Sequence, residues 1–134
     1  IKELGLEDKV FLRGSVPYTT MLRRFAEADV LAQTSVGFET QGMTVYEAAA
    51  VGTPSILCDH NIAGEFAKDV HWTVRDESVE ALAESISQAV ADIKVGDNRG
   101  ERLKNEDHLL QTGATAKMLK YYASVIEAHK AKSY

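Results

Sequence analysis

Short apolar runs alternate with helical patterns along the first 93 residues, and this alternation restricts the fold more than any other feature. The apolar runs predict strands at residues 10–13, 29–33, 54–58 and 72–74. Helical patterns cover residues 17–27, between the first two runs, and 43–51, between the second and third. A strand–helix–strand–helix–strand order implies a parallel sheet with right-handed crossovers. The sequence therefore predicts an α/β fold, with a parallel sheet flanked by helices.

Glycine, proline and capping residues mark the ends of two predicted helices. Gly52 takes the place of a left-handed residue just after the helix at 43–51, and Pro54 cannot continue that helix. Residues 79–93 then carry a regular stripe of apolar side chains at helical spacing. Asp76 or Ser78 is available to cap the N-terminus of this helix.

Three weaker patterns complete the prediction. A short helical turn is expected at 65–68, a helix at about 99–110, and a final helix at about 115–130, after a break at Thr112-Gly113. The final helix has an apolar face that we expect to point inward. This face consists of Met118, Leu119, Tyr122, Val125 and Ile126.

Size and composition are those of one ordinary globular domain. The chain has 134 residues, of which 45% are hydrophobic and 26% charged, so it can bury a core. Its formal net charge of −5 argues against nucleic-acid binding, which needs a basic face. We expect no nucleic-acid partner, and no apolar stretch approaches the length that spans a membrane.

The single cysteine, Cys58, cannot form an intrachain disulfide, and we therefore expect a cytoplasmic protein. The chain begins at Ile1, with neither a methionine nor a signal-peptide pattern. We expect it to be a truncated part of a longer protein.

Two glutamates, Glu39 and Glu47, flank the predicted start of the helix at about Gly42 to Thr44. The first N–H groups of a helix lack intrahelical partners and carry partial positive charge, which suits a phosphate. Gly42 lets a ligand approach the backbone closely, and Thr44 adds a hydroxyl donor. Glu47 lies one turn inside the helix, where its carboxylate can accept hydrogen bonds from a vicinal diol such as a ribose. Glu39 lies in the loop before the helix, where a carboxylate can hold sugar hydroxyls.

Other interpretations of these residues remain open. A glutamate near a helix start often does no more than compensate the helix dipole. Paired carboxylates also occur in glycoside hydrolases, but eight positions that are half loop do not determine a carboxyl separation. Asp59 and His60 follow a predicted strand and either line the ligand cleft or form a solvated loop pair, the interpretation that we favour. The four histidines lack zinc-ligand spacing, and no metal site is expected.

Several stretches resemble the group 1, family 4 retaining glycosyltransferases over about residues 4–93. They are Leu4 to Pro17, Ala28 to Ser35, Glu39 to Ile56, Gly64-Glu65 and the helix from Ser78 to Val90. The two-glutamate motif joined to Glu47-Ala48-Ala49-Ala50-Val51-Gly52-Thr53-Pro54 is the most specific part. This chain departs from the family pattern at Gln41, where the family usually has an aromatic residue or proline, and at Trp72, where a glycine is common.

The resemblance implies a GT-B fold whose C-terminal, Rossmann-like domain binds a nucleotide sugar. It implies that Glu47 holds the ribose hydroxyls and that Glu39, the candidate catalytic residue, contacts the transferred sugar. Backbone amides at Gly42, Met43 and Thr44 would face the diphosphate. The loop at Arg13, Gly14 and Ser15 would lie near the base. Further candidates for donor binding are Ser35, Phe38 and Gln41.

The expected activity is therefore hexosyl transfer with retention, from a UDP-, GDP- or ADP-sugar to an acceptor, without metal or other cofactor. We interpret residues 1–134 as a partial nucleotide-sugar-binding domain, with a core at about 1–93 and C-terminal helices at about 97–134. The partners implied are the nucleotide sugar and a missing N-terminal acceptor domain, without which the fragment is expected to be inactive. The full-length enzyme would be cytoplasmic or peripheral to a membrane.

Two alternatives remain, a GT-B sugar-nucleotide epimerase or phosphorylase and a receiver-like signalling domain with Asp59 as phosphoacceptor. Truncation would also expose a sheet edge and apolar surface, so we expect the fragment to self-associate.

Overall fold

The computed structural model describes residues 1–37, 42–104 and 111–131. Within these ranges the chain forms one parallel sheet, in the order β1 (Leu31–Gln33), β2 (Ser55–Leu57) and β3 (His71–Thr73). Helix α2 (Met43–Ala50) connects β1 to β2, and α3 (His60–Ala63) connects β2 to β3. This arrangement confirms the predicted Rossmann-like α/β fold.

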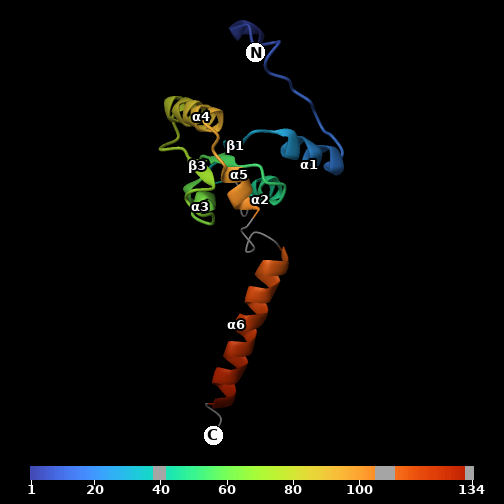
Figure 1. The fold of residues 1–134 in the computed structure, drawn as a ribbon, viewed down its shortest axis with the longest axis vertical. Helices are drawn as coiled ribbons and strands as arrows, with labels where there is room; N and C mark the ends of the chain where they lie inside the picture. Colours follow the sequence, from blue (N-terminus) through green and yellow to red (C-terminus); the bar gives the residue numbers. More distant parts are fainter. Residues whose placement is uncertain (38–41, 105–110, 132–134) are drawn as a thin grey trace.

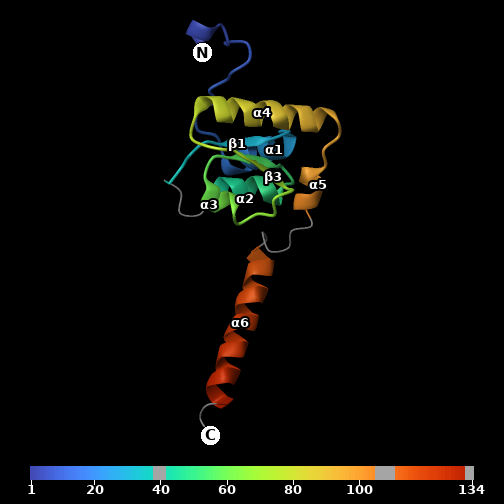
Figure 2. The same cartoon turned by 90° about the vertical axis from the view of Figure 1, so that its left-hand side faces the viewer.

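Helices cover both faces of the sheet (Figures 1 and 2). Helix α4 (Val79–Lys94) lies over one face, and α2 and α3 lie against the other. Successive side chains of a strand point to opposite faces. Ile56 of β2 therefore packs with Trp72 and Ala89 on the α4 side, whereas Leu57 packs with Val45 on the α2 side. The central strand β2 is buried on both faces, as its apolar sequence predicts.

Two further helices lie beside α2. Helix α1 (Tyr18–Glu27) contacts it, and the hydroxyl of Thr53 donates a hydrogen bond to the carbonyl of Phe25 (2.6 Å), near the C-terminal end of α1. The short helix α5 (Arg99–Leu103) approaches α2 so closely that a Cβ on Gly100 would lie 2.4 Å from the carbonyl oxygen of Gly52. Gly52 itself has a φ of +84°, which confirms the predicted left-handed residue after α2.

The cap of α4 is also as predicted. The Ser78 hydroxyl accepts a hydrogen bond from the N–H of Ala81 (3.1 Å), and Asp76 in turn accepts from the N–H of Ser78 (2.9 Å). Both candidate capping residues therefore act at this helix start, one directly and one through its neighbour.

Trp72 connects β3 to the C-terminal helices. Its indole N–H donates to Asp92 of α4 (2.8 Å), and the guanidinium of Arg99 lies 4.0 Å from its ring centroid. Arg99 also pairs with Asp92 (3.2 Å) and Asp97 (2.6 Å). The Trp72 side chain is therefore held by burial, a hydrogen bond and a cation–π contact. Local packing explains why a tryptophan stands at this position.

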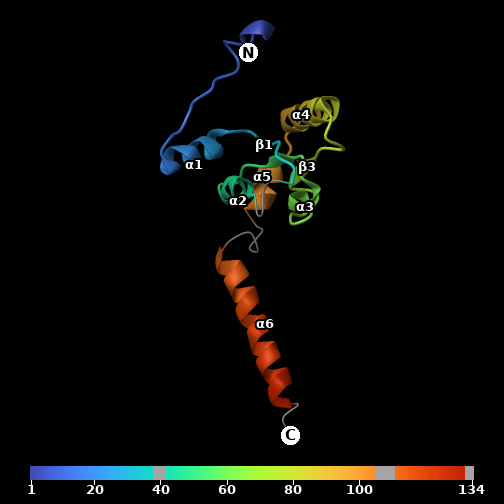
Figure 3. The ribbon, with the colours of Figure 1, turned by 180° about the vertical axis from the view of Figure 1, so that it is seen from behind.

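The strand predicted at 10–13 is wrong. A strand needs a neighbour for its backbone hydrogen bonds, and the described strands pair only with one another. Residues 10–13 are exposed instead, with Leu12 88% accessible, and the segment before α1 rises away from the domain (Figure 3). A 3₁₀ turn at Lys2–Leu4 precedes it.

Two other predictions are corrected. The helical turn placed at 65–68 lies earlier, as α3, because the Asp59 carboxylate caps that earlier turn. The break at Thr112-Gly113 lies inside α6 (Gln111–Ala131), and the apolar face of that helix, from Met118 to Ile126, is exposed rather than inward. Helix α6 extends away from the sheet (Figures 1 and 3), so none of the described elements of the domain covers this face.

Candidate functional site

The connections that follow the three strands meet at the carboxyl edge of the sheet, where ligands of parallel α/β folds bind. They enclose a cavity of about 380 Å³. Its lining comes from Val36 and Gly37 after β1, from residues 58–61 after β2, and from Asp76 and Glu77 after β3. A second cavity of about 300 Å³ shares Val36, Cys58, Asp76 and Glu77 with the first. The lining of neither cavity includes the described candidate residues Arg13, Gly14, Ser15, Ser35, Gly42, Met43, Thr44 and Glu47.

Helix α2 begins beside this edge at Gly42. Gly42 has a φ of +53°, a left-handed conformation, and a Cβ added there would lie 2.8 Å from Cδ1 of Ile62. The left-handed backbone conformation therefore favours glycine, and a larger residue would also require the Ile62 side chain to shift. The N–H of Val45 donates to the carbonyl of Gly42 (2.8 Å), whereas the Met43 and Thr44 amides belong to the first turn, where N–H groups lack intrahelical acceptors. Met43 is exposed and Thr44 is half-buried.

Glu47 lies on α2 one turn inside this N-terminus and is half-buried. Tyr18, the first residue of α1, lies close to this carboxylate. Interaction of its hydroxyl with the Glu47 side chain, together with burial and the negative charge of Glu47, raises the pKa of Tyr18 above its ordinary value of 10.0. Sequence reasoning missed Tyr18, because only the packing of α1 on α2 brings the two residues together.

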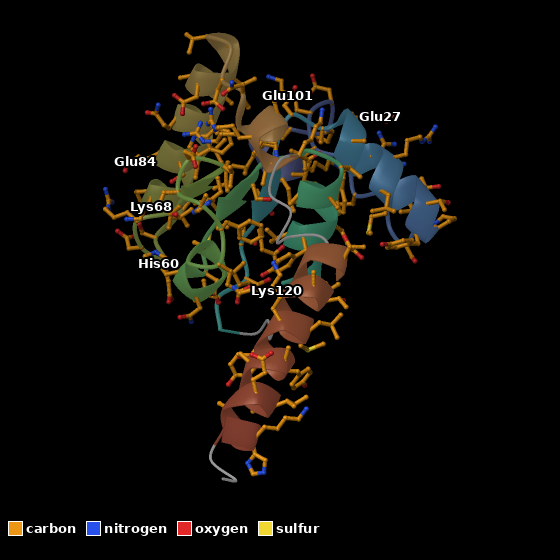
Figure 4. All side chains as sticks on the ribbon, turned by 60° about the horizontal axis from the view of Figure 1, so that its bottom comes forward. Glu27, His60, Lys68, Glu84, Glu101 and Lys120 are labelled. Carbon is orange, nitrogen blue, oxygen red and sulfur yellow. The ribbon has the colours of Figure 1, made fainter. Side chains whose placement is uncertain are left out.

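The contact predicts a pH effect. In a titration of ring-labelled tyrosines by NMR, we expect Tyr18 to ionise above the ordinary range, because the Glu47 carboxylate favours the neutral hydroxyl. Glu47→Gln removes the charge and should lower the pKa of Tyr18 toward 10.0. Glu27→Gln, at the other end of α1, is the matched control and should leave it unchanged (Figure 4). An unshifted Tyr18 in the wild-type chain would contradict the contact.

Asp59 is buried at the end of β2, with only 4% of the residue exposed. Its Oδ2 accepts a hydrogen bond from the N–H of Gly37 (2.9 Å), and its Oδ1 accepts from the N–H groups of Asn61 (2.8 Å) and Ile62 (3.3 Å). These donors, Gly37 foremost, hold the pKa of Asp59 below its ordinary value. For Asp59, the prediction of a solvated loop residue is therefore wrong. Because both oxygens are occupied by backbone donors, the carboxylate is also badly placed to act as a phosphoacceptor.

The neighbours of Asp59 have other roles. His60 is exposed on α3 (Figure 4), lines the larger cavity, and its Nε2 lies 2.7 Å from the carbonyl oxygen of Val74. Cys58 lines both cavities, and burial raises the pKa of its thiol. A raised pKa keeps the sulfur protonated and unsuited to nucleophilic attack.

The remaining predicted residues are only partly gathered at this edge. Ser35 follows β1 and accepts a hydrogen bond from Gln33 (3.4 Å). Arg13, Gly14 and Ser15 are exposed in the segment before α1, with the Arg13 guanidinium 4.7 Å from the ring centroid of Phe11. Phe38, Glu39 and Gln41 lie outside the described residues.

The described ranges lack two kinds of feature. No group of three or more histidine, cysteine, aspartate or glutamate side chains there is arranged to hold a metal ion. Among the helices of the same ranges, none combines the length and apolar character needed to cross a bilayer.

Comparison with known proteins gives one result. The model of the family described as "Glycosyl transferases group 1" matches residues 1–106, which include all three strands and helices α1 to α5. No curated protein and no solved structure matches the chain. Because the family match covers well over half of the chain and includes both the glycine-capped start of α2 and Glu47, the chain belongs to the group 1 glycosyl transferases.

Proposed function

We propose that this chain is the donor-binding domain of a retaining, family 4 glycosyltransferase with a GT-B fold, and that it binds a nucleoside-diphosphate sugar at the N-terminus of α2. The observation that carries the proposal is the pairing of a glycine-capped helix start with Glu47 one turn inside, within a region that the family model covers. Anion-binding and diol-binding groups thus lie a single turn apart.

The diphosphate is assigned to the amides at Gly42, Met43 and Thr44. A helix N-terminus carries roughly half a positive charge, and its first N–H groups point out of the helix. Gly42 has no side chain, and a Cβ there would lie 2.8 Å from Cδ1 of Ile62. During transfer the same amides would stabilise the charge that develops on the departing diphosphate, because their dipoles are already oriented.

The ribose is assigned to Glu47. A carboxylate has about four lone-pair positions, so it can accept both hydroxyls of a diol and still interact with the hydroxyl of Tyr18. Tyr18 also directly follows the segment that contains Arg13, Gly14 and Ser15, to which we assign the base. Glu39, Phe38, Gln41 and Ser35 are assigned to the sugar end of the donor from the sequence motif.

The acceptor is assigned to a further domain of a longer hexosyltransferase. The proposed roles account for donor binding and leaving-group stabilisation, and they include no group that orients an acceptor hydroxyl. We therefore propose that the 134-residue chain binds donor but transfers no sugar by itself.

A titration tests the proposal directly. UDP-glucose, GDP-mannose and ADP-glucose are each added to the ¹⁵N-labelled chain, and amide shifts are recorded. We expect at least one donor to shift the resonances of residues 42–47 in a saturable manner, with little change in α6. Absence of saturable shifts with all three donors would refute the proposed function.

A further inference from the structure

One buried aspartate holds both described ends of the connection between β1 and α2. This connection leaves the sheet after Gln33 and re-enters regular structure at Gly42. Its sequence contains Glu39, and its far end is the N-terminus to which the diphosphate is assigned. Whatever holds Gly37 and Gly42 in place therefore influences the geometry of the donor site.

The first end is held by a direct hydrogen bond. Oδ2 of Asp59 accepts from the N–H of Gly37 at 2.9 Å, and Asp59 is almost completely buried. Hydrogen bonds to an ionised acceptor are roughly twice as strong as those between neutral groups. Asp59 therefore fastens the chain that leaves β1 to the end of the neighbouring strand β2.

The second end is held through Ile62. Oδ1 of Asp59 accepts from the N–H groups of Asn61 and Ile62, which stabilises the single turn of α3. The Ile62 side chain then occupies the space next to Gly42, where a Cβ would meet three of its carbon atoms within 3.5 Å. Asp59 thus acts on Gly42 indirectly, because it positions Ile62, whose side chain packs next to Gly42.

We propose that Asp59 is a positioning residue for nucleotide-sugar binding, because one carboxylate sets the positions of Gly37 and Gly42 together. This inference rests on the proposed function. Asp59 touches no ligand in this role, since three backbone N–H groups occupy its oxygens. It acts by preorganising the amides at the start of α2 before the donor arrives.

Asparagine is the informative substitution. Asp59→Asn retains one acceptor oxygen, which can still cap α3, but it places an NH₂ group where Oδ2 accepts from Gly37. Two donors then face each other, so the hydrogen bond from Gly37 is lost while the side-chain size is kept. Asp29→Asn is the matched control, since Asp29 is exposed and precedes β1 at the opposite edge of the sheet.

The experiment compares the affinities of the wild-type chain and the two variants for UDP-glucose, GDP-mannose and ADP-glucose by amide shifts. We expect Asp59→Asn to remain folded by circular dichroism, to lose hydrogen-exchange protection at Gly37, and to bind at least about tenfold more weakly, within the range of ordinary coupling between sites. Asp29→Asn should bind as the wild type does. A folded Asp59→Asn chain with wild-type affinity would overturn the inference.

Hydrogen exchange of the wild-type chain keeps the inference testable if Asp59→Asn does not fold. Coupling between two events is reciprocal. If the hydrogen bond from Gly37 to Asp59 strengthens donor binding, saturating donor must therefore slow hydrogen exchange of the Gly37 amide by the same factor. Unchanged exchange at Gly37 overturns the inference and leaves the proposed function standing. A wild-type chain that binds none of the three donors overturns the proposed function itself.

Discussion

Glu47→Ala is expected to weaken binding of every nucleotide sugar. In the proposed arrangement its carboxylate accepts hydrogen bonds from the two ribose hydroxyls, which all three donor types possess. A hydrogen bond to a charged group contributes about 1.5 to 3 kcal/mol. Losing about 2 to 3 kcal/mol corresponds to a roughly 30- to 150-fold loss of affinity. Amide-shift titrations of the variant and the wild-type chain measure this loss.

The pattern of losses separates the roles of the two glutamates. Inorganic diphosphate has no ribose, so its affinity for the amides of α2 should change little in Glu47→Ala. Glu39→Ala should weaken sugar-bearing donors more than the bare nucleoside diphosphate, because Glu39 is assigned to the sugar. Glu80→Ala, on the exposed side of α4, controls for loss of one negative charge. Equal losses for all ligands in both variants would contradict these assignments.

Trp72→Ala is expected to produce the largest loss of stability. The residue is only 6% exposed, packs in the core on the α4 side of the sheet, and hydrogen-bonds Asp92. Replacing a buried tryptophan by alanine typically costs about 3 to 5 kcal/mol, because it leaves a cavity in a close-packed core. Domains of this size are stable by only about 5 to 15 kcal/mol, so the variant should lose a large share of its stability.

Urea unfolding followed by circular dichroism measures this change, since Trp72 is the chain's single tryptophan and its fluorescence is lost in the variant. Trp72→Phe keeps an aromatic ring but removes the indole N–H, and should fall between the wild type and alanine. Val79→Ala, at a position 78% exposed on α4, should be close to neutral. A Trp72→Ala chain as stable as Val79→Ala would show that the cluster around Trp72 contributes little.

Local chemistry explains which parts of the fold could be predicted. The helix at 43–51 ends correctly because Gly52 adopts the left-handed conformation that its position requires, and α4 begins correctly because Ser78 caps it. Residues 54–58 are recognisable as a strand because β2 is buried on both faces. In the two helices, the deciding interaction lies within a few residues of the sequence that signals it.

Two of the errors have a common cause, which is that burial depends on distant neighbours. Residues 10–13 carry the composition of a strand, but no described strand lies beside them to complete a hydrogen-bonded ladder. Helix α6 carries an apolar stripe, but it extends away from the layer that would cover it (Figure 3). Composition indicates that a surface can be buried, and only the tertiary arrangement supplies the partner.

The site divides in the same way. The sequence by itself determined the parallel α/β fold, the helix start at Gly42 and the presence of Glu47 one turn inside it, because helix geometry relates those two positions directly. Only the tertiary structure decided that Tyr18 lies close to Glu47 and that Asp59 accepts a hydrogen bond from Gly37. These contacts join separate elements, and their existence depends on how α1 and α3 pack around α2 and the sheet, which no local pattern of residues specifies.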